Sequence, residues 1–417
     1  MKKNLLAISL VLSMIGSLAG CSSGTAAQPS SQAAAPAAAA GSGTQSAASS
    51  SASASGTPIK IGGLLDFTGA VAELGPKFKA GMELAISDEG GSVAGHPIQL
   101  VTEDSATDVT KAVEQFKTLT EKEGCKLIVG PLMGDAQLAI APLAANKKAI
   151  CASLINGMYD TIKYKDYLIY PTTTEAQTYA FGQYVFEKLG YKTMVTVGAN
   201  YAGKKSYTQG VIQGFTSKGG KVVQSLWPDV GTSDYSSFIS TLKPSDCVLY
   251  ALEGPAPVSR FIYQYKQAGK TAPLLTITQD GDYTPEALKE LGDKALGIKG
   301  ESSYTWQLQN DENKKFVTAI KAKTGNIPSS SEQNAYAVTK VFLEALKKTN
   351  GDDSYDKMWP AITSLKMDTP QGPLLFNSEG VAITDAYVTQ AEKVNGQYQL
   401  SAPLDKTEQV KDARLKD

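Results

Sequence analysis

The 417-residue chain has few of the residues that nucleophilic catalysis and metal binding most often require, with only one histidine and four cysteines. His96 lies in the turn VAGHPIQ before an expected strand, at the sheet edge opposite the ends where ligands bind. The G-x-S-x-G spacing occurs only at residues 20–24, near the N-terminus and before any expected strand, so the sequence argues against a Ser-His-Asp hydrolase. Cys125, Cys151 and Cys247 lack the spacing of a zinc site, and we expect core thiols and no metal site.

Neither sign of charge is in excess, because 40 Lys and Arg residues stand against 41 Asp and Glu residues. No long run of either sign occurs, which argues against nucleic acid or an anionic membrane surface as the main partner. Beyond the N-terminus, no apolar segment approaches the roughly 20 residues that a membrane-spanning helix needs.

The N-terminus is the exception to this even composition. Lys2 and Lys3 precede an apolar run from Leu5, which is typical of a secretory signal over residues 1–20. The next residues, Leu18-Ala19-Gly20-Cys21, resemble the lipobox of bacterial lipoproteins, which implies cleavage before Cys21 and lipidation of that residue. An ordinary secretory signal with a stray cysteine is the alternative. Residues 22–57 contain no charged and no aromatic side chain, so we interpret residues 21–57 as the lipidated Cys and a disordered Ser/Ala linker.

One short stretch, VGANYAGKKS, nearly matches a phosphate-binding loop. Gly198, Gly203 and Lys204 have the G-x-x-x-x-G-K spacing. The motif then requires Ser or Thr to hold magnesium, but Lys205 stands there and cannot coordinate a metal. We therefore interpret the match as a coincidence, with Asn200 and Tyr201 in a loop that faces a cleft.

From Pro58 onward, short β-rich runs alternate with segments of helical periodicity. The runs IKIGGLL, HPIQLVTED, TMVTVGA and CVLYALE predict strands, and the periodicity predicts helices over 311–324, 331–348 and 355–365. The helix that follows HPIQLVTED is expected to begin with Thr107 or Asp108 as its cap. Asn395-Gly396 predicts a β-hairpin near the end, and residues 404–417 read as a charged C-terminal tail. This order predicts an α/β fold with two Rossmann-like lobes.

Ligands of such sheets bind beyond the carboxyl ends of the strands, and a cleft between two lobes is a preferred place for a small molecule. Three stretches carry a family resemblance: IKIGGLLDFTGAVAELGPKFKAGMELAISDEGG and, further on, LIVGP and TPQGPLLFNSEG. In them the chain resembles the type I periplasmic binding proteins of the branched-chain amino-acid-binding group. The resemblance implies ABC uptake, a three-stranded hinge with crossings near 171–174, 303–304 and 370–372, and lobes that close as a trap. It implies lobe 1 from residues 58–172 and 304–370, and lobe 2 from 173–303 and 371–403.

The ligand-binding candidates follow from the strand-end rule together with this resemblance. They are Asp66, Phe67, Thr68, Met133, Gly134, Asp135, Ser153, Leu154, Ile155, Asn156, Tyr201, Tyr207, Glu253, Asp280, Tyr304 and Trp306. Gly134, Asp135 and Ile155 stand where relatives carry hydroxyl residues for a ligand carboxylate. Carboxylates outnumber cations in the set, which favours a ligand that carries an amine.

Several alternatives remain open at this level. The ligand can be an amino acid or related amine, or else an aromatic or other small organic acid. Asp135 and Asp282 stand just before expected helices, where such residues are more often N-caps than ligand contacts. The chain can serve a permease or can pass a ligand signal to a membrane receptor, and a hydrolase that uses paired carboxylates is the enzymatic alternative. We expect a monomer that is not an enzyme, has no cofactor, and is anchored outside the cytoplasm.

Overall fold

The structure, a computed structural model, describes residues 56–155, 159–168 and 175–411, without the side chains of Tyr159, Gln279 and Asp280. The expected signal peptide, Cys21, the linker up to residue 55, Asn156 and the first crossing near 171–174 lie outside these residues. In the part of the chain that is described, no helix has the length and apolar character to span a bilayer.

Lobe 1 is a mostly parallel sheet whose strand order is β2-β3-β1-β4-β5-β6. Only β2 runs antiparallel, beside β3. The strands are β1 (Ile59–Leu65), β2 (Ser92–Val93), β3 (His96–Asp104), β4 (Leu127–Val129), β5 (Ile150–Ala152) and β6 (Tyr167–Leu168). Its helices are α1 (Leu74–Asp88), α2 (Val109–Lys117), α3 (Gly134–Lys147), α10 (Asp311–Thr324), α11 (Ser330–Lys348) and α12 (Tyr355–Thr363), with short turns η1 (Thr118–Lys122) and η2 (Tyr159–Tyr164).

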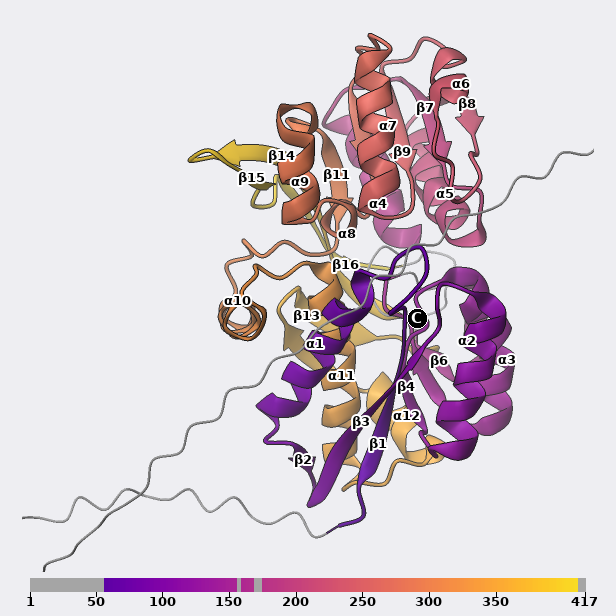
Figure 1. Ribbon diagram of the computed structural model, residues 1–417, viewed down its shortest axis with the longest axis vertical. Helices are drawn as coiled ribbons and strands as arrows, with labels where there is room; N and C mark the ends of the chain where they lie inside the picture. Colours follow the sequence, from indigo (N-terminus) through magenta and orange to yellow (C-terminus); the bar gives the residue numbers. More distant parts are fainter. Residues whose placement is uncertain (1–55, 156–158, 169–174, 412–417) are drawn as a thin grey trace, which may run out of the picture. The chain divides into compact units, whose positions relative to one another are not determined.

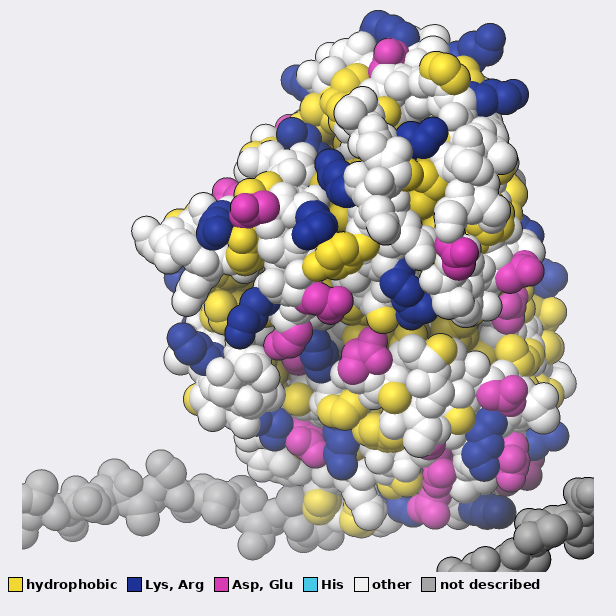
Figure 2. Space-filling view, turned by 45° about the horizontal axis from the view of Figure 1, so that its top comes forward, with side chains coloured by type: hydrophobic (Ala, Val, Ile, Leu, Met, Phe, Trp, Pro, Cys, Tyr) yellow, Lys and Arg dark blue, Asp and Glu magenta, His cyan; other side chains and the backbone are white. Residues whose placement is uncertain are grey.

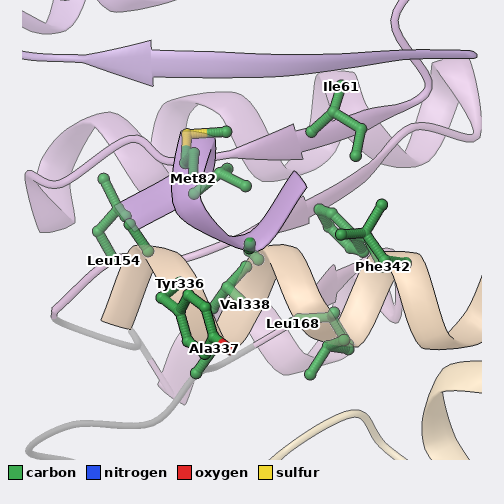
Figure 3. Packing of buried hydrophobic residues seen from close by; sticks show 14 of the residues in the cluster. Ile61, Met82, Leu154, Leu168, Tyr336, Ala337, Val338 and Phe342 are labelled. Atoms are coloured by element: carbon green, nitrogen blue, oxygen red, sulfur yellow. The ribbon is translucent and has the colours of Figure 1, made fainter. Parts of the chain in front are cut away.

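Helices cover both faces of this sheet. Successive side chains of a strand point to opposite faces, so each strand contributes to a core on either side. Helices α1 and α11 lie on one side of the sheet and α2 and α3 on the other (Figure 1). Ile61 of β1 joins the core under α1 and α11, whereas Leu64 joins the core under α2 and α3. Figure 3 shows Met82 of α1 and Val338 and Phe342 of α11 in the first of these cores.

Lobe 2 is built on the strand order β14-β11-β10-β9-β7-β8, in which β14 is antiparallel to β11 and the others are parallel. Its strands are β7 (Thr193–Gly198), β8 (Lys221–Leu226), β9 (Cys247–Ala251), β10 (Leu274–Thr276), β11 (Lys299–Ser302), β14 (Ala382–Val394), β15 (Gln397–Leu400) and β16 (Asp405–Val410). Its helices are α4 (Glu175–Glu187), α5 (Ala202–Ser217), α6 (Ser236–Ser240), α7 (Pro255–Gln267), α8 (Gln279–Asp282) and α9 (Pro285–Leu291), followed by the turn η3 (Gly292–Ala295).

The elements predicted from local patterns are confirmed. Helix α10 has the predicted bounds, and α11 begins one residue earlier than predicted. Asp108 caps α2 by accepting a hydrogen bond from the backbone N–H of Lys111 at 2.7 Å. Asn395 and Gly396 both have positive φ, as a tight turn between β14 and β15 requires.

Two predictions about the C-terminal part are wrong. The third crossing lies later than 370–372, because Leu374 and Phe376 of β13 (Gly372–Phe376) pack in the lobe-1 core, and β14 carries the chain on to lobe 2. The strand β12 (Lys366–Thr369) pairs with β13. Residues 405–410 of the expected tail form β16, which pairs with β14.

The face in Figure 2 carries Lys and Arg side chains interspersed with Asp and Glu.

Candidate functional site

The loop after β1 is organised by two carboxylates of lobe 1. Asp66 is 1% exposed, and its Oδ1 accepts hydrogen bonds from Ser105 Oγ at 2.8 Å and Thr107 N at 2.7 Å. Its Oδ2 is buried and has no hydrogen-bond partner among the described residues. Burial raises the pKa of Asp66, although hydrogen bonds from Ser105 and Thr107 oppose the rise. Asp66 therefore ties its loop to the loop after β3.

Asp104, which was not among the candidates, holds the next two residues. Its carboxylate accepts hydrogen bonds from the backbone N–H groups of Phe67, Thr68 and Ala106, and from Thr68 Oγ1 at 2.6 Å. Burial acts to raise the pKa of Asp104, but these hydrogen bonds, led by that from Thr68, outweigh it and lower the pKa. Asp104 is the last residue of β3, so the strand-end rule applied to that strand would have pointed to it.

The candidates after β4 and β5 have different environments. Met133 and Gly134 begin α3, and Asp135 in its first turn is exposed. Ser153 is fully buried, and Ile155 is half-buried against the lobe-1 core. Leu154 is a core residue with no exposed surface. Figure 3 shows it among the hydrophobic side chains of the lobe-1 core. Asn156 lies outside the described residues.

In lobe 2, Tyr201 and Glu253 form a pair at the ends of the neighbouring strands β7 and β9. The Tyr201 hydroxyl donates a hydrogen bond to Glu253 Oε2. Tyr201 is buried and Glu253 is half-buried. Burial, and then the Glu253 carboxylate, hold the pKa of Tyr201 well above its usual value, so the tyrosine stays a neutral donor.

Beside this pair lies a second set of polar groups at the ends of β10 and β11. Lys204 is 3% exposed, and its Nζ donates to Thr278 Oγ1 at 2.9 Å. Thr278 Oγ1 lies 3.1 Å from Asp282 Oδ2, and the Thr278 N–H donates to Glu301 Oε2 at 3.3 Å. Asp282 and Glu301 are also buried. A buried lysine beside buried carboxylates is a costly arrangement unless the charges offset each other.

Tyr207 completes the buried cluster. It is fully buried, and within the described part of the chain its hydroxyl has no hydrogen-bond partner. Burial, and then the Glu253 and Glu301 carboxylates, raise its pKa far above the usual value. We call Tyr201, Lys204, Tyr207, Glu253, Thr278, Asp282 and Glu301 the lobe-2 cluster. Lys204, Thr278 and Glu301 were not among the candidates, and the side chain of Asp280 lies outside the described residues.

The remaining candidates, Tyr304 and Trp306, lie in the segment between β11 and α10 and line a separate cavity of about 530 Å³. Tyr304 is buried and donates to Asn313 Oδ1 at 2.8 Å, and Trp306 is half-buried. No residue of the lobe-2 cluster lines this cavity. The described residues contain no cluster of side chains able to hold a metal ion.

Two α/β lobes, with buried polar side chains at the carboxyl ends of the lobe-2 strands, define a protein that binds a small molecule. The chain belongs to the family described as periplasmic binding protein, which matches residues 58–397, and within it to the branched-chain amino-acid-binding-like group. This family is extracytoplasmic and supplies the substrate-binding proteins of ABC transporters. The family assignment made from the sequence is thus confirmed.

Known relatives are distant but cover most of the chain. Leu/Ile/Val-binding protein homolog 6 of Brucella melitensis is 24% identical over 345 residues, covering 81% of this chain and 88% of the relative. An ABC transporter substrate-binding protein from Sphaerobacter thermophilus superimposes with a TM-score of 0.79 at 23% identity, over 85% and 99% of the two chains. A solute-binding protein from Rhodopseudomonas palustris, solved with 3,4-dihydroxybenzoic acid, gives 0.78 at 24% identity over 86% and 99%. A leucine-binding protein from Thermotoga maritima gives 0.75 at 23% identity over 82% and 98%.

Proposed function

We propose that the chain is an extracytoplasmic substrate-binding lipoprotein of an ABC uptake system. In this proposal it binds an amino acid or a related amine-bearing compound between its lobes and delivers it to a membrane permease. Cys21 carries the lipid anchor, and residues 22–57 tether the folded part to the membrane. A ligand that contacts both lobes stabilises their closed arrangement, which is the form that a permease would recognise.

The observation that carries the amine is the charge balance of the lobe-2 cluster. Glu253, Asp282 and Glu301 are three carboxylates, and Lys204 is the single ammonium among them. An ammonium group on the ligand would form charge-assisted hydrogen bonds with the Glu253 carboxylate. Glu253 is the best placed of them, because it is half-buried and Tyr201 fixes one of its oxygens.

Lobe 1 offers complementary groups for a ligand carboxylate. Helix α3 begins at Gly134, and its first backbone N–H groups carry the positive end of the helix dipole. Ser153 follows β5 nearby in the same sheet. Asp135 is exposed, so water screens its repulsion of an anion at this helix end. A molecule with an amine at one end and a carboxylate at the other matches both walls.

An aromatic or other small organic acid is the alternative ligand. Solved neighbours include proteins bound to aromatic acids and a leucine-binding protein, and both kinds share this fold at less than 25% identity. They therefore do not decide between the two ligand classes. An acid without an amine would place no cation beside the half-buried carboxylate of Glu253, which is why we favour the amine. A receptor in place of the permease is the alternative partner.

Isothermal titration calorimetry with the full chain tests the proposed ligand class. The titrants are amino acids, polyamines and aromatic acids, together with acids that match each amino acid except for its amine. We expect binding of an amine-bearing compound. Glu253→Gln should weaken it by about tenfold to a hundredfold, since one charge-assisted hydrogen bond contributes roughly 1.5–3 kcal/mol.

The matched control is Glu290→Gln, which removes an exposed carboxylate elsewhere in lobe 2. It should leave the affinity unchanged. Binding of amine-free acids alone, or equal affinities in the Glu253→Gln and Glu290→Gln variants, would contradict the proposal.

A further inference from the structure

The cavity beside Trp306 has walls of a different chemistry from the lobe-2 cluster. Four aromatic side chains line it, together with the aliphatic side chains of Leu288, Ile327 and Leu400. The aromatic residues are Tyr283, Tyr304, Trp306 and Tyr398. Its volume of about 530 Å³ is in the range that holds an organic molecule larger than one ring.

The tyrosine walls are fixed by hydrogen bonds to residues outside the cavity. Tyr304 donates to Asn313 Oδ1 at 2.8 Å, and Tyr398 donates to Asp293 Oδ1 at 2.7 Å. The hydroxyl of Tyr283 is bonded to that of Tyr250. Because these hydroxyls are already satisfied, the tyrosines offer the cavity their rings. Walls that are held in place before binding reduce the entropy lost when a ligand binds.

Hydrogen bonds also hold the segment after β11, which carries Trp306. Gln307 Nε2 donates to the carbonyl oxygen of Leu400, which joins the segment after β11 to the end of β15. Asn313 Nδ2 donates to the carbonyl oxygens of Trp306 and Leu308, each at 2.8 Å. The indole of Trp306 packs against the lobe-1 core and is half-buried, so one part of it remains available to a ligand.

Lys289 is the single charged residue among the described residues that line the cavity. Lys289 is exposed on α9. Its ammonium forms no ion pair or hydrogen bond with another residue in the described part of the chain. No carboxylate lines the cavity in that same part. Flat apolar walls with one free ammonium at the rim match an anion on an aromatic body.

We propose that this cavity is a second ligand site, which takes a multi-ring aromatic carboxylate. The rings lie between the aromatic walls, and the carboxylate meets the Lys289 ammonium. The site is distinct from the amine-binding cleft proposed above, since it shares no residue with the lobe-2 cluster, and it does not depend on that function being correct.

Fluorescence titration of the full chain with 2-naphthoate tests the site, with neutral 2-naphthamide as the matched probe. We expect saturable binding of both. Lys289→Gln should weaken naphthoate about fivefold and leave naphthamide unchanged, because an exposed ion pair contributes at most about 1 kcal/mol. Trp306→Ala should weaken both probes about tenfold through lost ring contact.

Lys266→Gln removes another exposed lysine of lobe 2 and should change neither probe. Lys289 is exposed, so its replacement tests the site even if Trp306→Ala fails to fold. The proposal is overturned if naphthoate does not bind, or if Lys289→Gln leaves its affinity unchanged. Loss of naphthoate binding in Glu253→Gln would place the acid in the cleft and overturn it as well. Failure of amine binding alone affects only the function proposed above.

Discussion

The close approach of α1 and α11 gives a stability prediction that can be worked from distances. Gly81 lies inside α1, where a Cβ atom would stand 2.1 Å from the carbonyl oxygen of Glu332 and 3.0 Å from the backbone nitrogen of Tyr336. Both atoms belong to the backbone of α11 and cannot rotate away. Gly81→Ala therefore requires the two helices to separate by roughly 1 Å, since nonbonded carbon and oxygen atoms need about 3 Å or more.

Two opposing effects set the magnitude. Alanine inside a helix is more favourable than glycine by about 1 kcal/mol. Overpacking of a tight core costs about 1–3 kcal/mol, and rigid backbone atoms favour the upper end of that range. We therefore expect Gly81→Ala to lower the free energy of unfolding by about 2 kcal/mol.

Urea unfolding followed by circular dichroism measures this difference. Lys79→Ala in the same helix is the control, because it changes helix propensity without entering the interface, and it should shift stability by less than about 0.5 kcal/mol. A Gly81→Ala protein as stable as the wild type, or more stable, would refute the idea that this contact limits how closely the helices pack.

Three further substitutions test individual polar groups. Burial raises the pKa of Asp66 above its unfolded value, so wild type should gain stability relative to Asp66→Asn as the pH falls from 7 toward the usual aspartate range. Urea melts at several pH values measure that gain, which linkage limits to about 1.4 kcal/mol per pH unit, and parallel curves would contradict it. Tyr207→Phe should leave the free energy of unfolding unchanged or higher, because the hydroxyl is buried without a partner; a loss above about 1 kcal/mol in urea would argue for a hidden hydrogen bond. Asp104→Ala should cost about 2–4 kcal/mol in the same assay, since four donors to its carboxylate lose their acceptor, and a neutral effect would contradict that role.

Features that depend on neighbours in the sequence could be predicted from it. The Asn395-Gly396 turn follows from the positive φ that both residues tolerate, and the Asp108 cap follows from its position before an amphipathic segment. The strand β16 was missed because its charged residues have no apolar alternation. Its backbone pairs with the edge of β14 instead. The sequence of residues 405–410 carries no signal for this pairing.

The site could be predicted less completely, because the strand-end rule selects positions and not side-chain directions. It found Tyr201 and Glu253, which the fold brings into contact. It also selected Leu154, which faces the core, and Trp306, which lines another cavity. It missed Lys204, because burial of a lysine depends on Thr278 and its neighbours, more than 70 residues away in the chain.

The environment of Lys204 also explains why a near-match to a phosphate-binding loop does not imply phosphate binding here. Tyr201 and Lys204 lie about one helical turn apart at the start of α5, so the first reaches Glu253 after β9 and the second reaches Thr278 after β10. A phosphate-binding lysine must present its ammonium to the ligand, whereas this ammonium already donates to Thr278. The same Thr278 contacts the carboxylates of Asp282 and Glu301, and negative charge so close would repel a phosphate. The same residues that resemble a nucleotide loop are therefore better placed for the amine proposed above than for a phosphate.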